Sequence, residues 1–489
     1  MKKLGLVFLL ISLFLLLNGC DLVTSPIDEE VPIVPIDPIV TDTNVEPFTR
    51  LFNDEIEKSL IITISNAEWT GLNDAMISYA EQFGGDLRTD HYAKADLTYT
   101  DDLGRVEIAD IGLRTRGNLS RVLVENSDGS LNLSNFKISF DEDFDQADLK
   151  ANKKRTVFEL EELDMKFNRN WDSTYLSEKF SLDLFNEFGV YAATTTLANL
   201  YITIGEETHY YGLYTLFEPI DEQFLQRRMT ETQAEGNLYK SLWQQFMPAS
   251  LQYVTYPQEI GMKDVSTNYR PTYDLKTNEK VGDTSDLAAF INQINSLNDL
   301  DFVQYIDDYF NVDMFLRQLA VGVLLGNPDD YRAMGNNYYF YHDNLLNIWT
   351  MIPYDYDHGL GQGWTGEPVF TDYTIGADIY EWGNLNQVFL NVETYAHPLV
   401  DRILNVSKYQ VLYENYLALL IDPENHLFSY EQFLSQYNMQ KGLYDDMLSD
   451  AMMNLNFDLR NIEWYMNGKI ADIDNQLTFY ALHPEMRGK

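Results

Sequence analysis

Residues 311–331 read NVDMFLRQLAVGVLLGNPDDY, a stretch that joins a predicted helix to a polar loop. Apolar residues recur at helical spacing up to Leu324, and Asn311 stands before them as a natural N-cap. The Gly-Asn-Pro sequence that follows is typical of a sharp helix end. The pattern therefore predicts a helix whose end is followed at once by two carboxylates, Asp329 and Asp330.

Further carboxylates come after this helix. Two strand-like runs, Asn337–Tyr341 and Ile348–Pro353, are followed by Asp355 and Asp357. In an extended chain, side chains two residues apart point to the same face. Oxygen ligands from separate segments suit Mg²⁺ or Mn²⁺, and an additional aspartate near a hydroxyl can accept its proton. The alternative is that these are turn residues, because Asp and Asn are common in turns.

The first half of the chain is rich in predicted strands. Five runs carry β-branched or alternating residues: Leu60–Ile64, Ile111–Gly117, Asn135–Phe140, Tyr191–Ile204 and Tyr210–Pro219. In the third run the alternation places the phenylalanines and the isoleucine on one face and a lysine on the other.

Helices are predicted between and after these strands. An apolar stripe of Leu176, Phe180, Leu184 and Phe188 indicates a helix that Asp172 or Ser173 would cap. From about Pro398 onward the chain has the pattern of further amphipathic helices. Strands first and helices later predict an α+β protein, compatible with two lobes and a cleft.

The amino-acid composition narrows the range of possible functions. The 489 residues include 34 basic and 76 acidic side chains, which give a net charge of −42 at pH 7. An apolar share of 45%, with 14% aromatic residues, indicates a folded core rather than a disordered chain. Because a chain with this negative charge would repel the phosphates of nucleic acid, we expect no nucleic acid partner.

The N-terminal region has the features of an export signal. A basic start precedes an apolar run, Leu4–Leu17, which is too short for a comfortable membrane span. The following Leu-Asn-Gly-Cys-Asp resembles the bacterial lipobox, in which the cysteine carries lipid. We therefore expect a lipoprotein signal peptide at 1–19 and a lipid-anchored, acidic, Pro-rich spacer at 20–47. This predicts a protein held on the extracytoplasmic face of the cell membrane through Cys20, and a lone cysteine excludes disulfides.

Several motifs, in order along the chain, resemble those of the spore-coat protein H (CotH) kinase-like family. RTRGNLS and FKISF are similar to its opening motifs, and YGLYTLFEPID to its central segment. GNLYK, GNPD, NYY and IPYDYD complete the series. Each motif alone is weak, but the ordered set is specific and spans about Arg114 to Gly361, half of the chain.

The resemblance implies an atypical protein-kinase-like, two-lobed fold that binds ATP with Mg²⁺ or Mn²⁺. It would phosphorylate Ser or Thr of surface or secreted proteins. Carried over by motif, Asp329 would be the catalytic base, with Asp330 as the fallback. Asn337 would be the metal-binding amide, and Asp355 and Asp357 the candidates for the metal-binding aspartate.

Basic residues must also reach the phosphates. Four lie within the motifs and are candidates for cofactor binding: Arg114, Arg116, Lys137 and Lys240. Glu178, on the predicted early helix, could orient one of these cations as an ion-pair partner, or it could be a surface helix residue. Lys137 could equally belong to a solvated strand face. Glu218 could pair with an arginine of the Gly turn or merely end a strand.

Two departures from ordinary kinases leave alternatives open. The first half has no G-x-G-x-x-G, and Asp329 and Asn337 are eight residues apart where ordinary kinases have five. A non-catalytic binding or assembly protein of the cell surface is the main alternative, and a metal-dependent phosphohydrolase is a weaker one. The expected division is a CotH kinase-like domain at 48–400 and a helical C-terminal extension at 401–489.

Overall fold

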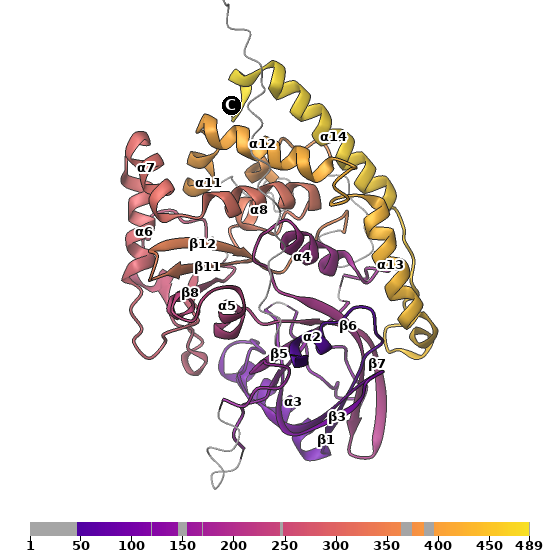
Figure 1. Ribbon diagram of the computed structural model, residues 1–489. Coiled ribbons are helices and arrows are strands. Elements are labelled where there is room, and N and C mark those ends of the chain that lie inside the picture. Colours follow the sequence, from indigo (N-terminus) through magenta and orange to yellow (C-terminus); the bar gives the residue numbers. More distant parts are fainter. Residues whose placement is uncertain are drawn as a thin grey trace, which may run out of the picture. The chain divides into compact units, whose positions relative to one another are not determined.

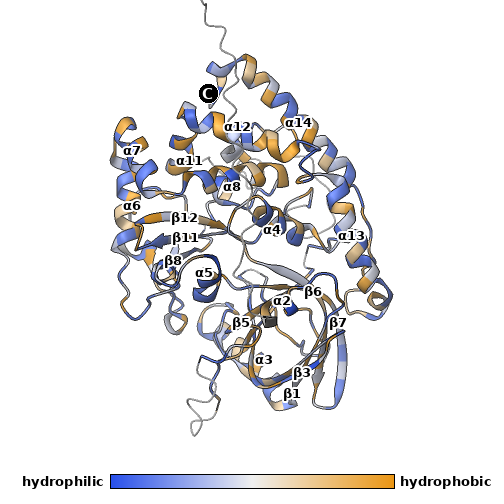
Figure 2. Cartoon of the chain, viewed as in Figure 1, coloured by the Kyte–Doolittle hydropathy of each residue, from blue (hydrophilic) through white to orange (hydrophobic). Residues whose placement is uncertain are grey.

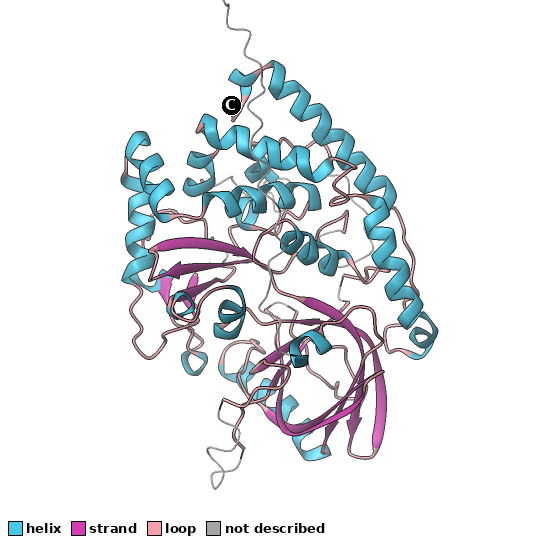
Figure 3. Ribbon diagram, viewed as in Figure 1, coloured by secondary structure: helices cyan, strands magenta, loops and turns pink. Residues whose placement is uncertain are grey.

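The computed structural model describes residues 46–118, 120–144, 154–168, 170–244, 248–362, 374–385 and 396–488. They belong to a compact unit that runs from Pro38 to Lys489, and a separate unit, Met1–Asp37, lies outside the described residues. The expected signal peptide and most of the expected spacer also lie outside them. Strands and helices are both abundant, which confirms the α+β class (Figure 3).

A closed barrel forms the first part of this unit (Figure 1). Its strands follow the spatial order β1-β2-β3-β4-β5-β7-β6. Neighbours pair antiparallel, except that β1 closes the ring by pairing parallel to β6, with Ser59 opposite Asn199. The strands are β1 (Ser59–Ile64), β2 (Ala93–Asp101), β3 (Gly104–Thr115), β4 (Phe136–Ser139), β5 (Glu162–Phe167), β6 (Thr195–Ile204) and β7 (Glu207–Phe217).

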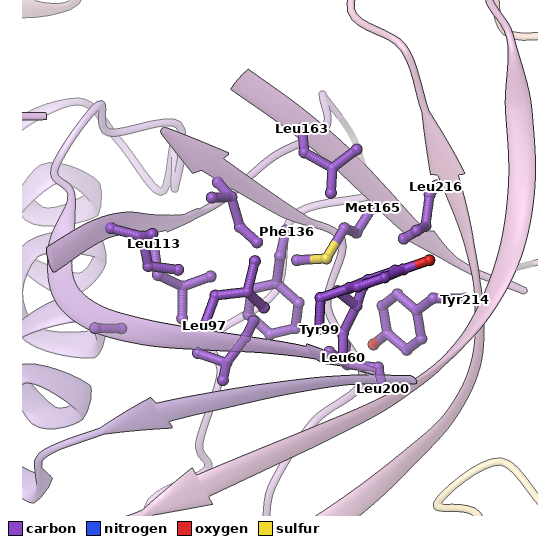
Figure 4. Packing of buried hydrophobic residues seen from close by; sticks show 14 of the residues in the cluster. Leu60, Leu97, Tyr99, Leu113, Phe136, Leu163, Met165, Leu200, Tyr214 and Leu216 are labelled. Carbon is purple, nitrogen blue, oxygen red and sulfur yellow. The ribbon is translucent and has the colours of Figure 1, made fainter. Parts of the chain in front are cut away.

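Alternate side chains of these strands fill the barrel (Figure 4). Phe136 and Ile138 of β4 are fully buried there, with Leu60 of β1 and Tyr214 of β7. The predicted alternation of this strand is confirmed, since Lys137 lies on the opposite face. Because side chains occupy its interior, the barrel is a packed core, and polar side chains are left to its outer face.

Strand β5 presents charged residues on that outer face. Its sequence ELDMKF alternates strictly, and Leu163 and Met165 are buried in the barrel core. Glu162, Asp164 and Lys166 therefore share the other face. This face carries the lysine on which the candidate site is built.

A second sheet follows, with spatial order β12-β11-β8-β10-β9. Its strands are β8 (Asn237–Ser241), β9 (Ile260–Gly261), β10 (Tyr273–Leu275), β11 (Tyr338–Asp343) and β12 (Ile348–Pro353). Gly236 precedes β8 at a close approach, because a Cβ there would lie 1.9 Å from the His342 carbonyl oxygen. In the β11–β12 hairpin Tyr338 lies opposite Pro353, so Asn337 and Tyr354 meet at its open end.

Helices make up most of the remaining described chain. They are α2 (Glu46–Leu51), α3 (Asn66–Gln82), α4 (Ser177–Glu187), α5 (Glu222–Arg228), α6 (Ser285–Ser296), α7 (Asp299–Tyr309), α8 (Val312–Leu325), α9 (Tyr331–Met334), α11 (Pro398–Ile403), α12 (Ser407–Ile421), α13 (Tyr430–Tyr444) and α14 (Ile462–Leu482). Hydrophilic and hydrophobic residues are mixed along α13 and α14 (Figure 2), and the buried residues of α13 recur at helical spacing, at Phe433, Tyr437 and Tyr444. Within the described ranges, no helix combines the length and apolarity that crossing a bilayer requires.

Helix α8 is confirmed in detail. The Asn311 side chain accepts a hydrogen bond from the Met314 amide, as an N-cap does. Nearly every residue of the helix is buried, so it is a core helix rather than an amphipathic one. Gly326 ends it in the left-handed region, at φ 72°. A Cβ at this glycine would lie 1.8 Å from the Tyr465 hydroxyl, so only glycine fits.

Several predicted boundaries are wrong, and the strand predicted at Ile111–Gly117 is β3, which runs from Gly104 to Thr115. Helix α4 begins at Ser177, with Leu176 rather than Asp172 or Ser173 as the capping residue, although the Asp172 carboxylate still accepts the Ser177 amide. Strand β6 begins at Thr195 rather than Tyr191. The preceding amide of Thr194 is bound by the Glu218 carboxylate at 3.0 Å instead of joining a strand ladder.

Candidate active site

The candidate site is centred on the ammonium group of Lys166. Its Nζ lies 2.9 and 2.7 Å from the two carboxylate oxygens of Glu178 on α4. The same Nζ lies 2.6 Å from Asp355 Oδ1 and 3.4 Å from Asp357 Oδ2, both beyond the end of β12. One lysine therefore holds three carboxylates from two distant parts of the chain.

The charges of this group shift one another's pKa. Burial opposes the charge of Lys166, but the surrounding carboxylates raise its pKa well above the ordinary value. For Asp355 burial is likewise outweighed, and Lys166, Arg116 and Lys240 lower its pKa. Burial raises the pKa of Glu178, and the neighbouring aspartates add to the effect. Lys166 opposes this rise through its charge and its hydrogen bonds to Glu178.

The three carboxylates form a donor set that fits a divalent cation. Ligand oxygens of Glu178, Asp355 and Asp357 lie within 4.8 Å of one another. Carboxylate oxygens at this spacing are the hard ligands that Mg²⁺ and Mn²⁺ prefer. The ammonium of Lys166 contacts all three, so a cation bound by the aspartates would share them with this lysine.

The two aspartates do not meet in the way the sequence predicted. Asp355 has φ 60°, so the backbone leaves the extended region directly after β12. The expectation that an extended chain points both side chains to one face is therefore wrong. They converge because a left-handed turn at Asp355 and the contact with Lys166 bring them together. A non-glycine residue held in this region is strained, a feature concentrated at functional sites.

Two recesses flank the Lys166–Glu178 pair, and both residues line each of them. The first is lined by both charged and apolar residues: Arg116, Asp164, Leu182, Ala193, Phe217, Glu218, Pro219, Ile220, Pro353, Tyr354 and Asp355. The second is polar and contains Phe167, Asn168, Asn170, Asp172, Tyr175, Ser177, Thr215 and Asp357. Both recesses are small, and they give solvent access to the Lys166–Glu178 pair.

Asp329 and Asp330 differ in their surroundings. Asn336 donates a hydrogen bond to Asp329 Oδ1 at 2.8 Å, and the amide group of Asn337 donates to the Asp329 carbonyl at 2.8 Å. Burial raises the pKa of Asp329, and Asp355 and Asp357 add to that rise. Asp330 caps α9 by accepting the Ala333 amide at 2.9 Å, and burial raises its pKa to about 7.

The predicted cations separate into different environments. Arg116 lies in the first recess, where it donates to the Tyr354 hydroxyl at 2.6 Å and contacts Asp164 at 3.2 Å. Lys240 packs over the Tyr354 ring, 4.2 Å from its centroid, and makes no ion pair with the residues that the structure describes. Both groups lower the pKa of Asp355, which places their charge beside it.

Lys137 and Arg114 lie farther along the barrel face. Lys137 pairs with Glu162 and, at 3.3 Å, with Asp164. It is therefore part of a charge ladder on the strand face, rather than a free solvated lysine. Arg114 stacks over the Tyr92 ring, 5.1 Å from its centroid.

Glu218 does not pair with an arginine of the Gly turn. Its carboxylate is fully buried and accepts two bonds from Arg228 at 2.8 Å and one from Arg227 at 2.8 Å, both on α5. Burial opposes its charge, but the two arginines outweigh burial and lower its pKa to about 2. Glu218 is thus a structural anchor in the lining of the first recess.

Lys166 was not among the cations predicted from the sequence, although Glu178 was expected to orient one. The signal was present in the ELDMKF segment, whose alternation puts Lys166 on the polar face with Asp164. The Asn336 contact with Asp329 was also not predicted, because the spacing alone does not choose between neighbouring asparagines.

These features describe an α+β protein in which a strand lysine and carboxylates from distant segments share one recess. Comparison with known families assigns it: the sequence pattern of the CotH kinase protein family matches residues 113–443, more than half of the chain. The chain therefore belongs to the CotH kinase family. All the residues of the candidate site lie within the matched region.

A curated relative supports the same assignment. The chain is 26% identical over 205 residues to the inner spore coat protein H of Bacillus subtilis (strain 168). The alignment covers 41% of this chain and 51% of the relative, so the chain spans about half the length of the relative.

Proposed function

We propose that this chain is a metal-dependent protein kinase that transfers the terminal phosphoryl group of ATP to Ser or Thr hydroxyls of surface or secreted proteins. The observation that carries the proposal is the contact of Lys166 with Glu178 on one side and Asp355 on the other. Protein kinases use a strand lysine paired with a helix glutamate, next to an aspartate that holds the metal. The barrel and the helical part would be the two lobes of such a fold.

Different residues of the site would bind the metal and the phosphates. Asp355 and Asp357 would hold Mg²⁺ or Mn²⁺, which neutralises phosphate charge when bound, with Asn337 beside them at the hairpin end. Lys166, Arg116 and Lys240, which lie in or beside the first recess, would bind phosphate oxygens.

Asp329 would accept the hydroxyl proton as the hydroxyl oxygen forms its bond to phosphorus and the bond to the ADP oxygen breaks. Its raised pKa suits a base that must hold and release a proton near neutral pH. Asp330 would keep the α9 cap in place rather than touch the substrate.

A thermal-shift and transfer experiment tests this function. ATP with Mn²⁺ at about 100 times the dissociation constant should stabilise the protein by about 2.7 kcal/mol. The shift should disappear in the double variant Asp355→Ala/Asp357→Ala, and radiolabel from γ-labelled ATP should appear on an acceptor protein. A parent protein that shows no shift at saturating ATP and Mn²⁺ would contradict the proposal. Release of free phosphate without labelled protein would identify a phosphohydrolase instead.

A non-catalytic binding protein of the cell surface is the second candidate. Lys166 already contacts all three carboxylates that a metal would need and neutralises one of their three charges, so it competes with a metal for these oxygens. In this case the protein would have no transfer activity, and the variants Asp329→Ala and Asp355→Ala would bind the partner protein as well as the parent does.

A surface location fits both candidates. The relative is named as a spore coat protein, and the expected lipid on Cys20 would hold this chain at the extracytoplasmic face of the membrane. Labelling of growing cells with a radioactive fatty acid tests the anchor. Cys20→Ser should abolish the label and release the protein from the membrane fraction.

A further inference from the structure

Five basic side chains gather on the barrel side of the molecule, in a chain whose net charge is −42. They come from the loop after α3, from the end of β3 and the loop that follows it, and from the segment between β9 and β10. We call this group the basic cluster; its members are Arg88, Arg114, Arg121, Lys263 and Arg270. Contacts show that they lie close together: Arg270 donates to the Arg88 carbonyl at 3.3 Å, and both arginines lie beside Asp86. Their mutual repulsion lowers the pKa of Arg121, Lys263 and Arg270 further than burial alone does.

Two carboxylates form ion pairs with the basic cluster. Asp86 pairs with Arg88 at 2.6 Å and lies 3.9 Å from Arg270. Asp90 pairs with Lys263 at 3.3 Å. Two further carboxylates, Glu142 and Glu162, act within the cluster on the charge of Arg114 alone. Four carboxylates thus face five cations, and the three exposed cations, Arg88, Lys263 and Arg270, have only Asp86 and Asp90 as ion-pair partners among the described residues.

Arg121 contributes a further positive charge to the cluster. It donates to the backbone carbonyls of Gly117 at 3.0 Å and Thr89 at 2.6 Å, and it makes no ion pair within the described ranges. Burial lowers its pKa to about 9, and repulsion from Arg114 adds to the effect. The Nε of Arg114 is buried and has no hydrogen-bond partner in the described part of the chain. An anion beside the exposed members of the cluster would relieve this repulsion.

The basic cluster is accessible from solvent. The side chains of Arg88, Lys263 and Arg270 are 27%, 24% and 16% exposed. Four of the five cations are arginines, whose planar forks match the oxygens of a phosphate dianion. A carboxylate offers less charge and fewer acceptor oxygens than a phosphate dianion.

The basic cluster is also next to the candidate active site. Arg114 and Arg116 lie two residues apart on the same side of β3 and its extension, about 7 Å along the strand. Arg116 lines the first recess, and Arg114 belongs to the cluster. A polypeptide whose hydroxyl reaches the recess could therefore place a nearby residue on the cluster within a few extended residues.

We propose that the basic cluster is a docking site for a phosphorylated Ser or Thr of the acceptor polypeptide, separate from the recess that would bind ATP. The identity of this partner rests on the proposed function. A segment that already carries one phosphate would be held while a neighbouring hydroxyl enters the recess, so the enzyme would favour clustered modification of one chain.

Fluorescence anisotropy with the full chain and no nucleotide tests the docking site. The probe is a labelled synthetic peptide of Gly, Ala and Ser that carries one phosphoserine, and its control is the same peptide with serine. We expect the phosphopeptide to bind at least tenfold more tightly than its control. Lys263→Gln/Arg270→Gln should weaken binding about tenfold, while Lys408→Gln/Lys441→Gln, which removes two exposed lysines on α12 and α13, should not.

Asp90→Asn distinguishes docking from a structural role. It removes a competing negative charge and should strengthen phosphopeptide binding several-fold, whereas a purely structural ion pair predicts no gain. Thermal unfolding of each variant checks its fold, and the gain by Asp90→Asn remains a test if Lys263→Gln/Arg270→Gln does not fold.

Three results would overturn the docking site: equal binding of both peptides, displacement of the phosphopeptide by inorganic phosphate at matching affinity, or loss of peptide binding in Lys166→Met. The second would show that the cluster takes a free anion, and the third that the peptide lies in the ATP recess. Phosphopeptide binding without any transfer from ATP in a separate assay would contradict the proposed function alone.

Discussion

Lys166 of β5 and Glu178 of α4 are joined by both carboxylate oxygens, at 2.9 and 2.7 Å. The pair lies between the barrel and the helices, and it lines a recess on each side. Any change in the position of α4 relative to β5 would stretch this contact. The pair therefore links the placement of the helix to the charge state of the site.

Replacement of Lys166 should abolish phosphoryl transfer more than it weakens the fold. Lys166→Met keeps the length of the side chain and removes its charge, so transfer should fall by about a hundredfold or more. Radiolabel incorporation from ATP measures the loss. The matched control is Lys94→Met, at a half-exposed lysine on the barrel's outer face, and it should leave the rate unchanged. Equal rates for the parent and Lys166→Met would contradict the assigned role.

The affinity of the site for Mn²⁺ should depend on Asp355 and Asp357. Asp355→Asn and Asp357→Asn each remove a charged ligand, so the Mn²⁺ concentration at half-maximal thermal shift should rise about tenfold or more. Titration of Mn²⁺ at fixed ATP measures this, and EDTA should remove the shift. Asp102→Asn, at an exposed turn, serves as the control and should titrate like the parent.

The transfer rate should distinguish the role of Asp329 from that of Asp330 when each is replaced by asparagine. Asp329→Asn removes the proposed base and should lower the rate about a hundredfold or more, whereas Asp330→Asn keeps a side chain that caps helices. Because burial raises the pKa of Asp329, activity should fall as the pH drops through a value well above the ordinary range of an aspartate. If activity instead fell only near the ordinary pKa of an aspartate, the result would contradict the assignment of Asp329 as the base.

Glu218 should matter for stability rather than for chemistry. Glu218→Gln leaves the buried Arg228 without its counter-charge and should cost about 3–5 kcal/mol of unfolding free energy. The pKa of Glu218 is lowered to about 2, from an ordinary value of 4.5, so its stabilising contribution is present above pH 4.5. It is lost as the pH falls toward 2.

Urea unfolding at several pH values measures this effect. The stability difference between the parent and Glu218→Gln should be large at pH 7 and should shrink toward pH 2. Glu206→Gln, at an exposed turn between β6 and β7, is the control and should change little at either pH. A difference that does not depend on pH would argue against the ion pair as its cause.

Local sequence patterns predicted much of the fold. The period of two in β4 and the apolar spacing and asparagine cap of α8 depend on neighbouring residues alone, and both are confirmed. The closure of the barrel could not be predicted, because the pairing of β1 with β6 depends on contacts between segments far apart.

The same limit explains the candidate site. Asp355 was chosen from its motif, but its left-handed backbone is imposed by the hairpin end and by Lys166. Lys166 carries no motif of its own, and its importance appears only when β5 and α4 are brought together. Residues that act through distant partners were therefore the ones that sequence reasoning missed.

Barrel closure has a consequence for biogenesis. Ser59 pairs with Asn199, so the partner of β1 emerges from the ribosome 140 residues later. Until then, the amides and carbonyls along one edge of the first strand are unpaired. Such an edge can pair with another chain and so promote aggregation. A chain exported unfolded would escape that hazard during synthesis and meet it instead on the far side of the membrane. Factors that shield the edge of β1 until β6 has been made should therefore raise the yield of folded protein.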